Sequence, residues 1–130
     1  MGTIGPKALL DTIGGTPLVG LTRLLPDCPA RLFAKLESFN PGGSAKDRSA
    51  QAIVAEALAS GRIGRGSTLV ESSSGNFAVA LARLALLHDM KAVCVVDPRT
   101  NPATLAIVRA LGAEVVPVTE PDPDTGDWLV

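Results

Sequence analysis

The feature that most constrains the fold of this chain is a regular alternation between strand-like and helix-like segments. Short β-type runs occur at residues 32–37, 68–71, 92–96 and 115–118. Stretches with helical periodicity lie between them, at about 45–60, 77–88 and 102–111. Strand–helix–strand spacing of this kind favours right-handed crossovers and a parallel sheet. We therefore expect an α/β fold.

The composition agrees with that fold and excludes several classes of function. The sequence is 46% hydrophobic but has one Trp, three Phe and no Tyr, so its core must consist of small aliphatic residues packed on a parallel sheet. With a net charge of −1, the sequence lacks the excess of positive charge that is typical of proteins that bind nucleic acid or an anionic membrane. No apolar stretch is long enough to span a bilayer, so we expect a cytoplasmic protein. The two cysteines and the single histidine have no metal-ligand spacing, so we expect no metal site, and Cys94 is predicted to be a core residue.

Residues typical of helix ends mark two of the three predicted helices. Ser44 is a good N-cap for the first, with Asp47 three residues on approximating a capping box. Asn101 followed by Pro102 is a standard start for the third. The middle helix is apolar almost all round, so it should be buried on more than one side. One face of the first helix is also predicted to be apolar: Ala50, Ile53, Val54, Ala57 and Leu58.

A glycine-rich turn runs directly into the first helix and places a lysine in its first turn. Residues 40–48 read Asn-Pro-Gly-Gly-Ser-Ala-Lys-Asp-Arg, so the lysine is Lys46. An uncharged lysine amine is the nucleophile that condenses with an aldehyde, and the macrodipole at a helix N-terminus opposes a cation. From position alone, however, a solvated surface lysine paired with Asp47 or Glu37 is the simpler interpretation.

A serine-rich loop precedes the apolar middle helix. Residues 71–77 read Glu-Ser-Ser-Ser-Gly-Asn-Phe and lie at the carboxyl end of a predicted strand, the edge at which open α/β sheets bind ligands. Backbone N–H groups at a helix start bind anions, and serine hydroxyls add donors, so a substrate carboxylate would fit. An ordinary N-cap loop is equally consistent with these residue types.

Taken together, the order and spacing of the two motifs resemble the β-replacement enzymes of the fold-type II pyridoxal-phosphate family, to which cysteine synthase and cystathionine β-synthase belong. Residues 13–18 (Ile-Gly-Gly-Thr-Pro-Leu) and 109–115 (Arg-Ala-Leu-Gly-Ala-Glu-Val) carry the same resemblance, which covers almost the whole chain. It implies a three-layer α/β/α fold with a parallel sheet, of which this chain would be the N-terminal lobe. It further implies a leading segment of the larger lobe (1–35), a small mobile lobe (36–120) and the start of a return to the larger lobe (121–130).

The resemblance also implies a role for each matching residue. Lys46 would hold pyridoxal 5′-phosphate covalently and then act as acid and base at the substrate α-carbon. Asn76 would hydrogen-bond the 3′-hydroxyl of the pyridoxal ring. The loop that closes on the substrate α-carboxylate would consist of Ser73, Ser74, Asn76 and Phe77. The reaction would expel the leaving group of an O-activated L-serine, O-phosphoserine or O-acetylserine, to give an aminoacrylate to which a nucleophile adds, with the cofactor as electron sink.

A narrower likeness is to the siderophore and peptide-antibiotic branch of the family, whose enzymes make a 2,3-diaminopropionate precursor from O-phosphoserine and L-glutamate. It is carried by residues 94–98 (Cys-Val-Val-Asp-Pro) together with the motifs at 39–44 and 71–76. Cysteine synthases usually have Met-Pro at that strand end and Thr where Phe77 stands here. A cysteine synthase (O-acetylserine sulfhydrylase) remains the alternative. Family members are commonly homodimers that act on small amino acids, and we expect the same of the full-length protein.

Two parts of the family's site have no candidate in the chain: the Gly/Thr-rich loop that binds the cofactor phosphate, and the hydroxyl residue that meets the pyridine nitrogen. An acidic, Pro- and Gly-rich segment at 120–127 precedes a short apolar end at 128–130, which suggests truncation. We therefore expect the N-terminal portion of a transferase or lyase that alone binds pyridoxal phosphate weakly or not at all and is inactive.

Two alternatives to that enzyme fragment remain. One is a truncated, non-catalytic module that binds an amino acid at the loop of residues 73–76. The other is an unrelated nucleotide-binding α/β domain, which the sequence disfavours because no Gly-x-Gly-x-x-Gly follows a strand and no Gly-Lys-Ser/Thr phosphate loop exists.

Overall fold

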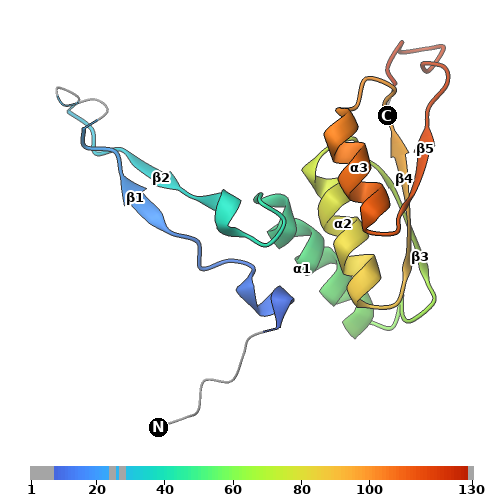
Figure 1. Ribbon diagram of the computed structural model, residues 1–130, viewed down its shortest axis with the longest axis horizontal. Helices are drawn as coiled ribbons and strands as arrows, with labels where there is room; N and C mark the ends of the chain where they lie inside the picture. The colour runs from blue at the N-terminus through green and yellow to red at the C-terminus, as the bar shows by residue number, and fades with distance from the viewer. Residues whose placement is uncertain (1–7, 24–25, 27–28, 129–130) are drawn as a thin grey trace, which may run out of the picture.

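The computed structural model describes residues 8–23, 26 and 29–128 (Figure 1). The helices are α1 (Lys46–Ala59), α2 (Asn76–Leu87) and α3 (Pro102–Ala110), with two 3-10 turns, η1 (Leu9–Thr12) and η2 (Glu37–Phe39). The strands are β1 (Leu18–Gly20), β2 (Phe33–Lys35), β3 (Thr68–Ser72), β4 (Lys91–Val96) and β5 (Glu114–Pro117). None of these helices is long and apolar enough to cross a membrane.

A three-stranded parallel sheet in the order β3-β4-β5 forms the centre of the fold, which confirms the predicted α/β class. α2 connects β3 to β4 and α3 connects β4 to β5, and both lie with α1 on one face of the sheet (Figure 1). The opposite face carries valines that are neighbours in the sheet register: Val70, Val93, Val95 and Val116. The described residues thus form one helical layer on the sheet, and the second layer of an α/β/α arrangement is not among them.

Small aliphatic side chains form the core, as the composition predicts. Its members include Ala50, Val54, Ala78, Ala82, Ala85, Cys94, Val96 and Val108. Alanines on facing sides let α1 and α2 pack closely, and α2 is buried on most of its sides, as predicted. On the predicted apolar face of α1, Ala50, Val54 and Ala57 are buried, whereas Ile53 is 56% exposed and lines an open groove beside the edge strand β3.

The segment 32–37 differs most from the predicted sheet. Its central residues form β2, but β2 pairs antiparallel with β1, Val19 opposite Ala34, in a separate two-stranded sheet that extends away from the helices (Figure 1). Glu37 begins the 3-10 turn η2 and does not continue the strand. A backbone hydrogen bond of 2.9 Å from the Leu36 N–H to the Pro17 carbonyl extends the pairing. A strand of three residues has too short an alternation to specify its partner from the sequence.

The helix starts agree with the sequence in one case and depart from it in another. Asn101 Oδ1 accepts the Ala103 N–H at 2.9 Å, which confirms the predicted cap of α3. At α1 the N-cap is Ala45 and not the predicted Ser44, whose hydroxyl accepts the Lys46 N–H at 3.2 Å. The predicted capping box is wrong, because the Asp47 carboxylate turns into the protein and binds other partners.

Candidate active site

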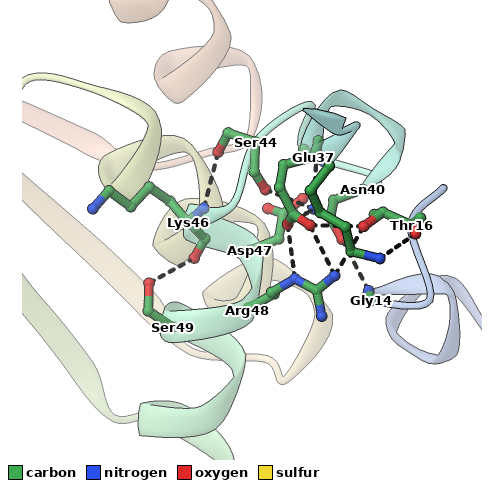
Figure 2. A network of polar contacts seen from close by, with 11 residues as sticks. Gly14, Thr16, Glu37, Asn40, Ser44, Lys46, Asp47, Arg48 and Ser49 are labelled. Carbon is green, nitrogen blue, oxygen red and sulfur yellow. Dashed lines mark hydrogen bonds and ion pairs between the residues drawn. The ribbon is translucent and has the colours of Figure 1, made fainter. Parts of the chain in front are cut away.

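Lys46 is the first residue of α1 and follows the Pro-Gly-Gly turn after Ser44 and Ala45. Gly43 has a φ of +77°, a left-handed conformation that favours glycine, and its N–H donates to the Asn40 carbonyl at 2.8 Å. This turn directs the chain into the helix. The Lys46 side chain is exposed and points away from the polar contacts around it (Figure 2). Across the described part of the chain its amine has no hydrogen bond or ion pair, so it is available to a ligand.

The charged residues near Lys46 pair with one another. Glu37 Oε2 lies 2.7 Å from Arg48 Nε. Asp47 Oδ1 lies 2.9 Å from Arg83 Nη1. The pairing of Lys46 with Asp47 or Glu37 is therefore wrong, whereas the exposed position of the lysine agrees with the simpler interpretation.

A buried amide joins the lysine turn to the start of the chain. Asn40 is 3% exposed, its Oδ1 accepts the Gly14 N–H at 2.9 Å, and its Nδ2 donates to the Ser44 carbonyl at 3.0 Å. Nδ2 also donates to Glu37 Oε2 at 2.8 Å, and the Thr16 hydroxyl donates to Glu37 Oε1 at 2.7 Å. The segments at 13–18 and 39–44, which carry the family resemblance, were the sequence signal for this network. Neither segment shows from its sequence alone that it hydrogen-bonds to the other.

Glu37 is the acceptor at the centre of this network (Figure 2). The hydrogen bonds from Arg48, then from Thr16 and Asn40, lower the pKa of Glu37 from its ordinary 4.5 to about 2. The carboxylate therefore stays ionised at neutral and mildly acidic pH, and it keeps Arg48 engaged beside the first turn of α1.

The serine loop leaves β3 at the carboxyl edge of the sheet and is tied to β4. The Ser73 N–H donates to the Val95 carbonyl at 3.1 Å, and the Ser74 hydroxyl accepts the Asp97 N–H at 2.9 Å. Asn76 is exposed and begins α2, and no side chain caps this helix end. Because the first N–H groups of a helix have no partner within it, those of α2 are available to an anionic group.

An open cavity of about 460 Å³ lies beside Ser74 at the same edge of the sheet. Its charged lining residues already neutralise each other, because Arg99 Nη2 lies 2.5 Å from Asp97 Oδ2. Hydrogen bonding from Arg99 lowers the pKa of Asp97 from 3.8 to about 2.

The topology brings the two motifs to one end of the sheet. α1 is joined to β3 through residues 60–67, at the amino end of that strand, so the start of α1 lies toward the opposite, carboxyl end. There β3 passes into the serine loop, and α1 packs directly against α2 (Figure 1). The site residues predicted from the sequence therefore share this end: Lys46, Ser73, Ser74, Asn76 and Phe77. Phe77 differs from the others because its half-buried ring packs against the core.

These groups fit a cofactor that carries an aldehyde and polar ring substituents. A free primary amine condenses with an aldehyde. The Asn76 amide and the uncapped N–H groups of α2 can bind ring oxygens or a carboxylate.

Residues 9–129 match the family model described as pyridoxal-phosphate dependent enzyme. Because that match includes nearly the whole chain, the protein belongs to the pyridoxal-phosphate dependent enzyme family. The family's cofactor is pyridoxal phosphate, as the resemblance of the two motifs implied.

The relatives specify the class further. The chain is 47% identical, over 120 residues and 92% of its length, to an N-(2-amino-2-carboxyethyl)-L-glutamate synthase from Ralstonia nicotianae. Its fold is similar to that of O-ureido-L-serine synthase, with a TM-score of 0.79 and 40% identity over 84% of the chain. An O-acetylserine dependent cystathionine β-synthase from Helicobacter pylori gives a TM-score of 0.78 and 36% identity over 88% of the chain. The predicted fold-type II architecture is thereby confirmed.

The chain spans only about a third of the length of these relatives. It covers 36% of the Ralstonia enzyme, 34% of the O-ureido-L-serine synthase and 38% of the Helicobacter enzyme.

Proposed function

We propose that this chain carries the lysine-bearing part of a pyridoxal-phosphate dependent β-replacement synthase that acts on an O-activated L-serine. The observation that carries the proposal is the free amine of Lys46, at the same end of the sheet as the uncapped start of α2, in a chain 47% identical to an amino-acid synthase of this family. All three relatives described above have names that refer to amino-acid chemistry, and two of those names contain an O-substituted serine.

Each residue of the site has a separate task in this proposal. Lys46 holds the cofactor through its amine and moves a proton at the substrate α-carbon. Asn76 donates to an oxygen of the cofactor ring and fixes its orientation. The loop of Ser73 and Ser74, with the N–H groups at the start of α2, binds the substrate α-carboxylate. When bound, the cofactor supplies the electron sink that makes loss of the leaving group feasible.

We assign L-glutamate as the nucleophile and O-phosphoserine as the activated serine. The identity to the Ralstonia synthase supports this choice over a cysteine synthase. Phe77 also supports it, because an aromatic residue replaces the hydroxyl that cysteine synthases usually have at this position.

The proposal extends to the whole protein. It assigns a cytoplasmic location, which one free, buried cysteine in the described residues suits, and a homodimer. It also assigns residues 36–120 to a small mobile lobe and residues 1–35 to a segment of the larger lobe. The separate β1–β2 sheet, which ends at Lys35, supports that boundary.

A segment exchange tests the proposal without any assumption about the length of this protein. Residues 9–128 of this chain replace the matching segment of the Ralstonia synthase, and product is measured by mass spectrometry from O-phosphoserine and L-glutamate. We expect the chimera to form N-(2-amino-2-carboxyethyl)-L-glutamate and the same chimera with Lys46→Ala to form none.

Other outcomes distinguish the alternatives. Formation of cysteine from O-acetylserine and sulfide, without the glutamate product, would favour a cysteine synthase. A folded chimera that forms neither product but still binds an amino acid would favour a non-catalytic binding module.

A further inference from the structure

Asp47 is a fully buried carboxylate directly next to Lys46. Its side chain is 1% exposed, and its neighbour in the sequence is the exposed lysine. One carboxylate oxygen accepts the Gly42 N–H at 2.5 Å, and the other accepts from Arg83 Nη1 at 2.9 Å. Asp47 therefore binds both the turn before Lys46 and a residue of α2.

Position 42 has room only for glycine, because the Asp47–Arg83 ion pair occupies the space where a β-carbon would lie. A β-carbon at position 42 would lie 2.6 Å from Asp47 Oδ2 and closer still to Asp47 Oδ1 and Arg83 Nη1. Real β-carbons essentially never approach other atoms so closely. The two glycines of the turn are thus needed for different reasons. Gly43 adopts a left-handed φ, and Gly42 leaves room for the ion pair.

Arg83 links this pair to the second motif. It lies roughly two turns after Asn76, and residues two turns apart share one face of a helix. Its side chain is 13% exposed and that of Asp47 is 1% exposed, so the pair is largely removed from water. A buried ion pair adds little net stability compared with an apolar pair, whereas loss of one partner leaves an uncompensated charge. The physical effect of the pair is therefore to hold α1 and α2 in one relative position.

We propose that Asp47 and Arg83 are positioning residues that set Lys46 against the start of α2 and leave its amine unpaired. The inference rests on the proposed function, in which Lys46 and Asn76 serve one cofactor. Fixing the Asp47 side chain fixes the backbone of the preceding Lys46, and the inward pairing of Asp47 keeps its carboxylate from the lysine amine. Glu37, the other carboxylate considered as a partner of Lys46, is paired with Arg48.

Selective trapping of pyridoxal phosphate on lysines tests the inference. The chimera described above, which is the parent chain in this test, is mixed with excess pyridoxal phosphate, reduced with borohydride, and mapped by peptide mass spectrometry. The ratio of modified Lys46 to modified Lys91 is the readout, because Lys91 is exposed at the amino end of β4, away from the site. The ratio reports selectivity, not enzyme activity.

Asp47→Asn is the main variant and Asp89→Asn its control. Asp89 makes an exposed pair with Arg65 at 3.5 Å and has a φ of +54°, which asparagine tolerates. We expect Lys46 to be preferred in the parent chain and in D89N, and the preference to fall at least about tenfold in D47N, as for a misplaced reacting group. Far-UV circular dichroism establishes that each variant is folded. If D47N does not fold, Arg83→Lys, which keeps the charge but loses the guanidinium fork, carries the test with a smaller expected fall.

Each outcome separates the inference from the function on which it rests. An unchanged Lys46 preference in folded D47N or R83K, with only a lower unfolding midpoint, would overturn the positioning role and leave Lys46 as the cofactor lysine. A parent chain that modifies Lys46 no more than Lys91 would overturn the proposed function itself.

Discussion

At the scale of single residues, the site is organised by pairing the charges of Glu37, Asp47 and Arg48 with other residues. Glu37 binds Arg48, Asn40 and Thr16, and Asp47 binds a backbone N–H and a guanidinium. Lys46 is left with no partner in the described chain (Figure 2). A lysine that is to bond an incoming aldehyde needs this environment, because an ion pair would hold it in the charged, non-nucleophilic form.

The low pKa of Glu37 gives a prediction about acid stability. A carboxylate whose pKa falls from 4.5 to about 2 on folding contributes stability above pH 4.5, and that contribution is lost as the pH falls from 4.5 toward 2. We expect the difference in free energy of unfolding between the parent chain and Glu37→Gln to be constant above pH 5 or so and to shrink through this window. Urea titrations at a series of pH values measure it. A difference that does not change with pH would contradict the pairing.

Cys94 gives a second prediction at this scale. It is 0% exposed, and burial raises the pKa of its thiol, so the reactive thiolate is disfavoured in the folded chain. In a Cys28→Ser variant, which leaves Cys94 as the sole thiol, we expect a disulfide reagent to react only at the rate of unfolding. Rapid reaction under native conditions, before any loss of far-UV signal, would show that Cys94 is accessible.

At the scale of elements, sequence periodicity and helix-end residues could predict α1, α2, α3 and β3–β5 to within a residue or two. The contacts that these signals could not predict join residues far apart in the chain. From the sequence Asp47 is typical of a capping residue, whereas in the structure it pairs with Arg83, 36 positions away. From the sequence Asn40 is typical of a turn, whereas in the structure it accepts a hydrogen bond from the Gly14 N–H, 26 positions away. The pairing of β1 with β2 is hidden for the same reason, since three-residue strands carry almost no pattern.

The start of α3 offers an element-scale prediction. Asn101 caps the first turn through its side-chain oxygen, and an alanine would leave that N–H without a partner. We expect Asn101→Ala to lower the free energy of unfolding by about 1 kcal/mol and Asn101→Gly by only a few tenths. Chemical denaturation of the three chains checks this order. Equal losses of free energy of unfolding in both variants would mean that the Asn101 side-chain oxygen does not stabilise the start of the helix.

At the scale of the whole molecule, the helices cover one face of the sheet and leave the other apolar. Val70 is 67% exposed on the edge strand β3, and Val116 is 37% exposed on β5. An exposed apolar sheet face beside an unpaired strand edge promotes association.

This exposed face gives the whole-molecule prediction. We expect Val70→Lys combined with Val116→Lys to reduce concentration-dependent association and binding of a hydrophobic dye, with the far-UV spectrum unchanged. Ile107→Lys, at a 49% exposed position on α3, is the control and should have little effect. Sedimentation velocity over a range of concentrations measures association. An equal reduction in the control would show that general surface charge, not the sheet face, is responsible.

The central claim is that Lys46 and Asn76 serve one cofactor. The most direct measurement is the identity of the lysine that carries pyridoxal phosphate after borohydride reduction, in the chimera with the Ralstonia synthase and in the same chimera with Asn76→Ala. We expect the label on Lys46 in the parent chimera, with that preference reduced in N76A because the ring loses its donor. Label on Lys35 or Lys91 in preference to Lys46, or a preference for Lys46 that N76A leaves unchanged, would contradict the claim.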